Sequence, residues 1–305
     1  RDTYRWRPLT LTCGFIKLIG VGMSGPVITG TEAADRINVG DENHTINAGD
    51  GNNQVVAGNG DNAIDAGRGN DKVTVGDGNN TIQIGEGTNR VLAGDGDNTI
   101  QSGKGNDQIT VGRGANVIST TGGNNRIIGS DGNTQVTTGS GKDDIRLGQG
   151  DNIVAAGEGA NKVSVGDGNN VVETGSGMDK ITLGNDDNVV TSVGRKNQIT
   201  AGNGQNEVRT GAGDDKITVG DGANEIEAGD GRNSIKAGAG DNQITTGKDS
   251  DNILAGDGDN SIDAGDGANR VVVGDGNNTL QAGSGRDDLR LGNGNNWVSA
   301  GDGDN

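Results

Sequence analysis

Aromatic and apolar residues are scarce in this sequence. Aromatic side chains make up 1% of the 305 residues and apolar side chains 29%, against roughly 45–50% apolar residues in an ordinary globular domain. A thick hydrophobic core is therefore excluded, and without a pattern the net charge of −18 would be typical of a disordered chain. The single Cys13 excludes an internal disulfide and gives no sign of a zinc or redox site.

Positive charge is also in deficit, with 25 Lys and Arg against 43 Asp and Glu. Such an acidic chain repels nucleic acid and anionic lipid, and it suits solubility or divalent cations. We therefore expect no nucleic-acid partner.

Residues 1–30 differ from the rest of the chain. They contain both prolines and an apolar run from Leu9 to Met23 behind a basic start, which is the outline of a secretory signal. Lys17 interrupts the run and no clear cleavage site follows, so we favour a capping or assembly segment and expect no membrane span. The predicted organisation is this segment followed by a repeat domain over residues 31–305.

Glycine is abundant and strictly spaced. From Gly40 to Gly301 a glycine recurs every nine residues, and only Thr121, Ser130 and Val193 replace it in that register. An aliphatic residue lies six positions after each of these sites, and a smaller inward residue follows two positions later. Alternation by two is the signature of a strand with one buried face, here only about three residues long. Such units bury nothing alone, so we predict an all-β, parallel β-solenoid in which they stack.

The repeat resembles the RTX family, whose unit is Gly-Gly-x-Gly-x-Asp-x-aliphatic-x. The runs Gly67–Val73 and Gly103–Ile109 match that unit well, and the resemblance covers residues 31–305. It implies a parallel β-roll with two nonapeptides per turn, calcium binding and an extracellular or cell-surface location. The departure is at the Asp of the unit: of the 30 such positions from 44 to 305, 21 are Asn and seven are Asp.

The remaining Asp residues recur every 36 residues, which defines a higher repeat of four nonapeptides. If calcium binds, they are the candidate ligands: Asp35, Asp71, Asp107, Asp143, Asp179, Asp215, Asp251 and Asp287. With 18 residues per turn, Asp and Asn would alternate along one edge, with carboxylates about 9.5 Å apart. With 36 residues per turn and four sides, the Asp residues would stack in one column. The family resemblance favours the first geometry and the 36-residue period favours the second.

Asparagine at the stacked position has chemistry of its own. An amide carries donors and an acceptor, so Asn residues one turn apart can form a ladder of side-chain hydrogen bonds along the axis. No cation is needed for such a ladder. We therefore expect an RTX-type scaffold in which amide ladders largely replace metal.

Catalysis has little support in this sequence. The only histidine, His44, occupies the Asn position of a repeat, where we interpret it as a substituted turn residue. Acid/base catalysis of the glycosidase kind needs one special carboxylate pair in a cleft, and a uniform solenoid provides no unique cleft. We expect that the protein is not an enzyme.

The function that we favour is an extracellular structural protein that forms a filament, sheath or surface layer by end-to-end stacking of copies of itself. The repeats run to Asn305 without a polar cap, and open solenoid ends invite another subunit. A missing cap in a piece of a longer protein is the alternative explanation. A calcium-binding RTX module of a secreted protein is the second function considered, and ice or polysaccharide binding by outward Thr is the third.

Overall fold

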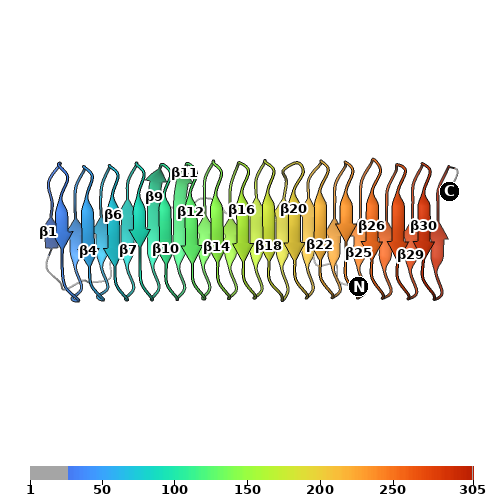
Figure 1. Cartoon of the computed structure of the whole chain (residues 1–305), viewed down its shortest axis with the longest axis horizontal. Coiled ribbons are helices and arrows are strands. Elements are labelled where there is room, and N and C mark those ends of the chain that lie inside the picture. Colours follow the sequence, from blue (N-terminus) through green and yellow to red (C-terminus); the bar gives the residue numbers. More distant parts are fainter. Residues whose placement is uncertain (1–26, 304) are drawn as a thin grey trace, which may run out of the picture.

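The computed structural model describes residues 27–303 and 305. Over these residues the chain forms strands joined by tight turns, and the strands lie side by side along one straight axis (Figure 1). The expected segment 1–30, with Cys13 and His-free apolar run, lies outside the described residues as far as residue 26. Val27–Thr29 already forms the first strand, β1, which pairs with the third.

Two parallel sheets make up the rod, because alternate strands pair with each other. The odd-numbered strands form the 16-stranded sheet A. Its members are β1 (Val27–Thr29), β3 (Thr45–Asn47), β5 (Ala63–Asp65), β7 (Thr81–Ile84), β9 (Thr99–Lys104), β11 (Val117–Gly122), β13 (Gln135–Thr137), β15 (Ile153–Ala155), β17 (Val171–Thr174), β19 (Val189–Ser192), β21 (Glu207–Thr210), β23 (Glu225–Glu227), β25 (Gln243–Thr245), β27 (Ser261–Asp263), β29 (Thr279–Gln281) and β31 (Trp297–Ser299).

The even-numbered strands form the 15-stranded sheet B on the other side of the rod. Its members are β2 (Arg36–Asn38), β4 (Gln54–Ala57), β6 (Lys72–Val75), β8 (Arg90–Leu92), β10 (Gln108–Val111), β12 (Arg126–Gly129), β14 (Asp144–Leu147), β16 (Lys162–Val165), β18 (Lys180–Leu183), β20 (Gln198–Ala201), β22 (Lys216–Val219), β24 (Ser234–Lys236), β26 (Asn252–Ala255), β28 (Arg270–Val273) and β30 (Asp288–Leu291).

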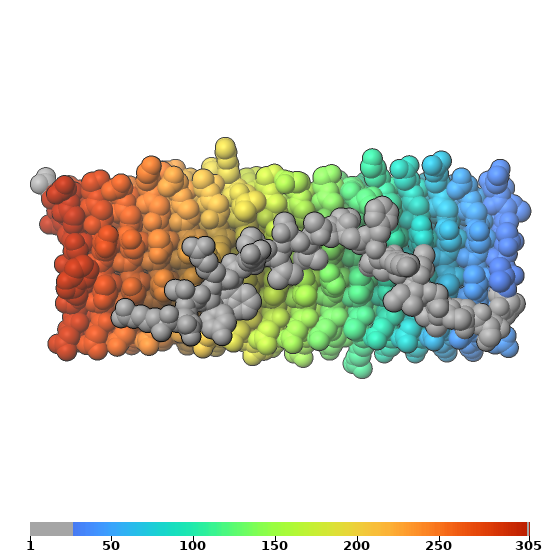
Figure 2. Space-filling model, turned by 180° about the vertical axis from the view of Figure 1, so that it is seen from behind, coloured from blue at the N-terminus to red at the C-terminus, as the bar shows by residue number. Residues whose placement is uncertain are grey.

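Each turn of the solenoid contains 18 residues. Val73 pairs with Val91, and Val91 pairs with Ile109, always in register. The predicted parallel β-roll with two nonapeptides per turn is therefore confirmed, and the alternative of 36 residues per turn is wrong. The space-filling view shows coils of even width stacked in sequence order (Figure 2). At a strand spacing of about 4.8 Å, the rod is roughly 70 Å long.

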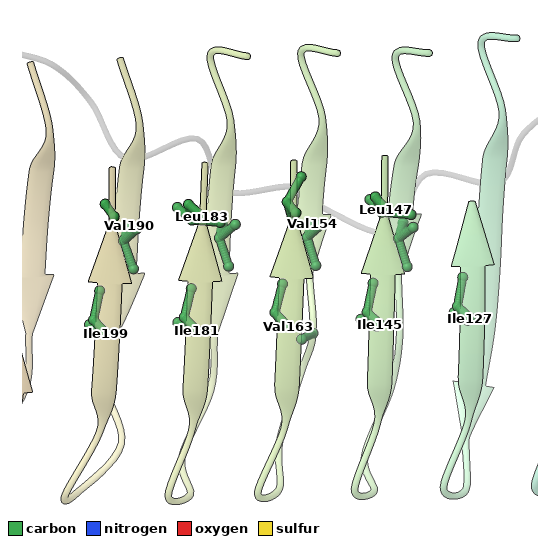
Figure 3. Close-up of a cluster of buried hydrophobic side chains, with 14 of the residues drawn as sticks. Ile127, Ile145, Leu147, Val154, Val163, Ile181, Leu183, Val190 and Ile199 are labelled. Atoms are coloured by element: carbon green, nitrogen blue, oxygen red, sulfur yellow. The ribbon is translucent and has the colours of Figure 1, made fainter. Parts of the chain in front are cut away.

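The core is a narrow double row of aliphatic side chains between the sheets. Ile127, Ile145 and Ile181 from sheet B are completely buried and face Val154 and Val190 from sheet A (Figure 3). Because each nonapeptide supplies one such residue, the core has the same width at every level. The smaller second inward residue of each strand, such as Ala57 or Ala66, is buried as well.

The turns need glycine because neighbouring coils approach closely. Gly105 has φ +145°, and a Cβ placed there would collide with the carbonyl group of Gly87 in the coil before it. A side chain is therefore excluded by both backbone conformation and space.

Two kinds of turn line the two long edges of the rod. We call the turns that precede strands of sheet A the Asn edge, and those that precede strands of sheet B the Asp edge. The described residues contain no helix that is long and apolar enough to cross a membrane.

Candidate functional site

The residue just before each strand points inward and is buried, so each edge contains one inner column of polar side chains. Along the Asn edge the column is almost entirely Asn, with His44 and Thr134 as exceptions. Along the Asp edge, Asp and Asn alternate from turn to turn, and all from Asn53 to Asp287 are at least 94% buried. The two columns share a backbone geometry but differ in chemistry.

Side-chain amides form a continuous ladder inside the Asn edge. Nδ2 of Asn62 donates to Oδ1 of Asn80 at 3.0 Å, and Nδ2 of Asn80 donates to Oδ1 of Asn98 at 2.9 Å. The same Nδ2 of Asn80 also donates to the Gly78 carbonyl at 2.9 Å. The ladder resumes at Asn152 and continues to Asn296. The predicted amide ladder is confirmed on this edge.

The Asp edge repeats one backbone bond with two residue types. The N–H of Asp71 donates to Oδ1 of Asn89 at 3.0 Å, and the N–H of Asn89 donates to Oδ1 of Asp107 at 2.9 Å. Oδ1 therefore has the same role in Asp and in Asn. The two residue types differ only in the other terminal atom, which is Nδ2 in Asn and Oδ2 in Asp.

That second atom meets backbone carbonyls of its own turn. Nδ2 of Asn89 donates to the carbonyl oxygens of Gly85 and Gly87 at 3.1 and 3.4 Å. At an Asp position an oxygen without a proton replaces this donor, so the corresponding carbonyls lose it. Oδ2 is buried without a hydrogen-bond partner in five of the carboxylates: Asp71, Asp143, Asp215, Asp251 and Asp287.

Burial also alters the acidity of these carboxyl groups. Desolvation raises the pKa of Asp71, Asp143 and Asp215 above the usual Asp range, and the hydrogen bonds that they accept offset only part of this effect. The same direction and main cause apply to the pKa of Asp107, Asp179 and Asp251.

A set of hydroxyl groups faces the carboxylates, and the sequence reasoning missed it. Oγ of Ser102 donates to Oδ2 of Asp107 at 2.5 Å. Thr138 lies beside Asp143 without a hydrogen bond of normal geometry, yet it offsets part of the rise in the Asp143 pKa. The signal was present in the sequence, since Ser or Thr stands five residues before an Asp at 102, 138, 174, 210 and 246.

The eight predicted ligands do not come together as one metal cluster. Successive Asp residues lie two turns apart with an Asn between them, as Asp71, Asn89 and Asp107 show. Within the described residues, no three His, Cys, Asp or Glu side chains are grouped closely enough to hold a metal. Asp35 differs from the others, because its Oδ2 accepts hydrogen bonds from the N–H and hydroxyl of Thr31 at 2.6 and 2.9 Å.

Calcium fits the two edges differently. It takes oxygen ligands, including carboxylates and backbone carbonyls, and the Asp turns offer a carboxylate oxygen beside carbonyls that no side-chain amide occupies. The Asn turns do not fit, because Nδ2–H already occupies the carbonyls.

Comparison with known families agrees with this architecture. The model of the RTX calcium-binding nonapeptide repeat matches residues 29–64, 47–82, 83–118, 119–154, 155–190, 193–226, 218–253, 245–280 and 272–305. The chain therefore belongs to the RTX calcium-binding nonapeptide repeat family, as its sequence motif predicts. A search among curated proteins found no match.

Proposed function

We propose that this protein is an extracellular structural β-solenoid that binds calcium along one edge only. The observation that carries the calcium part is the buried, unpartnered Oδ2 of Asp residues such as Asp143 and Asp215. At the equivalent position of the intervening turns, Nδ2 of Asn161 donates to the carbonyls of Gly157 and Gly159 at 3.2 and 3.1 Å. One turn is complete without an ion and the next is not.

The residues that would hold the ion are the carboxylate and the carbonyls four and two residues before it. At Asp143 these carbonyls belong to Gly139 and Gly141. Bound calcium supplies positive charge among oxygen atoms that otherwise repel one another. The N–H of Asn125 holds Oδ1 of Asp143 at 2.8 Å, which fixes the carboxylate and directs Oδ2 into its own turn.

This arrangement sets the expected number and effect of the ions. Binding is expected only at alternate turns of the Asp edge, from Asp71 to Asp287, and not at the Asn edge. Because the Asn ladder holds the coils together without metal, calcium removal is expected to lower the melting temperature without unfolding the rod at 25 °C.

Calorimetric calcium titration of the 305-residue protein tests the proposal, with thermal melts in calcium and in EGTA alongside. The double variant D143N/D179N is expected to lose two binding sites and keep the fold. The matched control is D95N/D131N, which removes two carboxylates from the outer surface of the Asn edge and is expected to keep every site. Absence of calcium binding by the wild type, or equal loss in both variants, contradicts the proposal.

End-to-end stacking is the structural role that we propose for the rod. Support comes from the last described coil, where β30 and β31 each pair on one side only. Trp297 and Val298 are 57% and 44% exposed there. Open strands beside uncovered apolar side chains are a template for pairing with another chain, and such a head-to-tail contact need not close.

Electron microscopy of the purified 305-residue protein tests this role. Fibres whose width equals one rod are expected at high protein concentration. V298K is expected to shorten them, whereas L254K, which changes an aliphatic residue of similar exposure (40%) on the side of the rod, is expected to have no effect. A strictly monomeric species at high concentration would rule out end-to-end stacking.

A further inference from the structure

Charge is segregated around the rod, although the chain as a whole is acidic. The outward positions of sheet B carry eleven Lys and Arg against two acidic residues, Asp144 and Asp288, by count of the first and third residues of its strands. The outer turns of the Asn edge carry sixteen Asp and Glu against Arg113, by count of residues 40–44 and the same five positions every 18 residues up to 296. A basic face and an acidic edge therefore run along the same rod.

The basic face contains like charges in direct contact positions. Lys162 is paired in register with Lys180, and Lys72 with Arg90. These side chains are exposed, and neighbouring strands are only about 4.8 Å apart. Like charges directly opposite each other destabilise a sheet, so the fold alone gives no reason for this arrangement.

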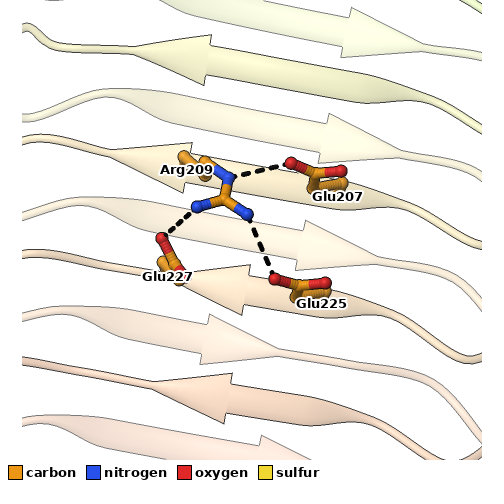
Figure 4. Close-up of polar contacts among 4 residues, drawn as sticks. All are labelled: Glu207, Arg209, Glu225 and Glu227. Atoms are coloured by element: carbon orange, nitrogen blue, oxygen red, sulfur yellow. Dashed lines mark hydrogen bonds and ion pairs between the residues drawn. The ribbon is translucent and has the colours of Figure 1, made fainter. Parts of the chain in front are cut away.

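Most of these cations have no ion pair within the described part of the chain. On sheet B the ion pairs are Arg146 with Asp144, and Arg270 and Arg290 with Asp288. Sheet A gives the contrast: Arg209 contacts Glu207, Glu225 and Glu227 at 2.8, 3.2 and 2.6 Å (Figure 4). A cation on this solenoid can thus be neutralised by its own sheet, and the sheet B row is not.

The acidic edge of the same molecule is too far away to neutralise that row. Lys72 begins β6, whereas Asp77 lies in the turn after this strand. Five residues of extended chain span about 16 Å, twice the screening length of about 8 Å at physiological salt. The edge carboxylates also stay ionised, since backbone and side-chain hydrogen bonds from Asn293 lower the pKa of Asp275.

We infer that copies of this protein associate side by side, with the basic face of sheet B of one rod against the outer surface of the Asn edge of the next. Charge complementarity selects the partner, and both surfaces share one axial repeat because they belong to the same coils. Contacts that are weak singly act together along the rod. The two surfaces differ, so the contact is heterologous and propagates into layers. This association is independent of the proposed end-to-end stacking.

Light scattering and small-angle X-ray scattering of the 305-residue protein in EGTA test the inference, at 20 and 500 mM NaCl. Wide, multi-rod particles are expected at low salt, with a several-fold fall in mass at high salt. K162Q/K180Q is expected to abolish the low-salt particles while keeping the wild-type melting temperature. K104Q/K142Q, which removes the same charge from the outer surface of the Asp edge, is expected to preserve them.

Three results would overturn the inference. The first is a single-rod species at both salt concentrations. The second is an equal loss of association in the two variants, which would trace the effect to net charge. The third is retention of single rods on immobilised sulfated polysaccharide, lost in K162Q/K180Q, which would assign the basic face to a polyanion. Particles that only lengthen, and that resist salt, report end-to-end stacking instead and also contradict side-by-side contact.

Discussion

The N–H of Asn89 donates to Oδ1 of Asp107 in the following coil at 2.9 Å, and this bond does not distinguish a carboxylate from an amide. Selection between Asp and Asn acts on the other terminal atom. Along the rod, that one atom decides whether a turn is complete in itself or requires a proton or a cation.

Replacing Asp143 by Asn is expected to stabilise the calcium-free protein. The new Nδ2 would donate to carbonyls of its own turn, as that of Asn161 does, and a buried unpartnered oxygen would disappear. Such a group costs about 1–3 kcal/mol, so the melting temperature in EGTA should rise. D95N on the outer surface is the control and should change little. A lower melting temperature for D143N than for D95N would contradict this assignment.

Replacing Thr134 by Asn is expected to close the gap in the amide ladder. Thr134 is buried with an unpartnered hydroxyl, and Nδ2 of Asn116 reaches only the carbonyls of Gly112 and Gly114. The added amide should connect Asn116 to Asn152 and raise the free energy of unfolding by about 1 kcal/mol. Chemical denaturation measures it, and an unchanged midpoint would show that the ladder adds little.

Breaking the ladder at Asn188 is expected to be damaging. Its Nδ2 donates to the carbonyls of Gly184 and Asp186 and to Oδ1 of Asn206, and N188L leaves all three acceptors without this donor. A loss of about 1–3 kcal/mol per uncompensated buried group follows. Q205L, at an exposed position nearby, serves as the control, and equal melting temperatures for the two variants would refute the ladder's importance.

Stability without calcium is expected to increase on mild acidification. Burial raises the pKa of Asp71, Asp143 and Asp215 in the folded state, so the folded chain binds more protons than the unfolded chain. Stability is then full below the ordinary Asp pKa of about 3.9 and falls as pH rises from there through the raised values. Melts in EGTA between pH 4.5 and 7.5 measure the slope.

The variant D143N/D179N should show a shallower pH slope, because two of the titrating groups are gone. Exposed carboxylates act in the opposite sense: hydrogen bonds lower the pKa of Asp266 and Asp275, so their contribution is lost below about pH 4. A melting temperature that rises from pH 4.5 to 7.5 in EGTA would contradict the prediction.

Glycine substitutions are expected to separate close contact from mere periodicity. Gly141 has φ +145° and a Cβ there would strike the carbonyl of Gly123, whereas nothing lies within 4 Å of a Cβ at Gly40. G141A should therefore lower the melting temperature strongly, and G40A should be tolerated. Similar losses for both would show that the close approach between coils is not limiting.

The nine-residue period was enough to predict the rod, its core and the alternation of Asp with Asn, because each depends on spacing alone. Asp71 and Asp107 lie two coils apart, as 18 residues per turn requires. The direction in which an amide points does not follow from spacing. Nδ2 of Asn80 reaches the next Asn, whereas Nδ2 of Asn89 reaches only its own turn, and only coordinates distinguish them.

Charge segregation was hidden for a related reason. In the sequence, Lys162 and Glu173 occupy successive repeats and seem to mix, but alternate repeats belong to opposite sheets. The net charge of −18 correctly indicates an acidic molecule and conceals a basic face. The hydroxyls beside the Asp residues required the same step, since Ser102 and Asp107 are brought together across a turn.

The pairing of every coil with the one 18 residues away also determines how the rod would respond to force. Hydrogen bonds between coils run along the axis, so tension applied at the two chain ends would load them in series and peel the terminal coil first. Each released coil of 18 residues adds about 60 Å of extended chain. Under load the molecule would lengthen in equal steps, each leaving a shorter rod of the same construction.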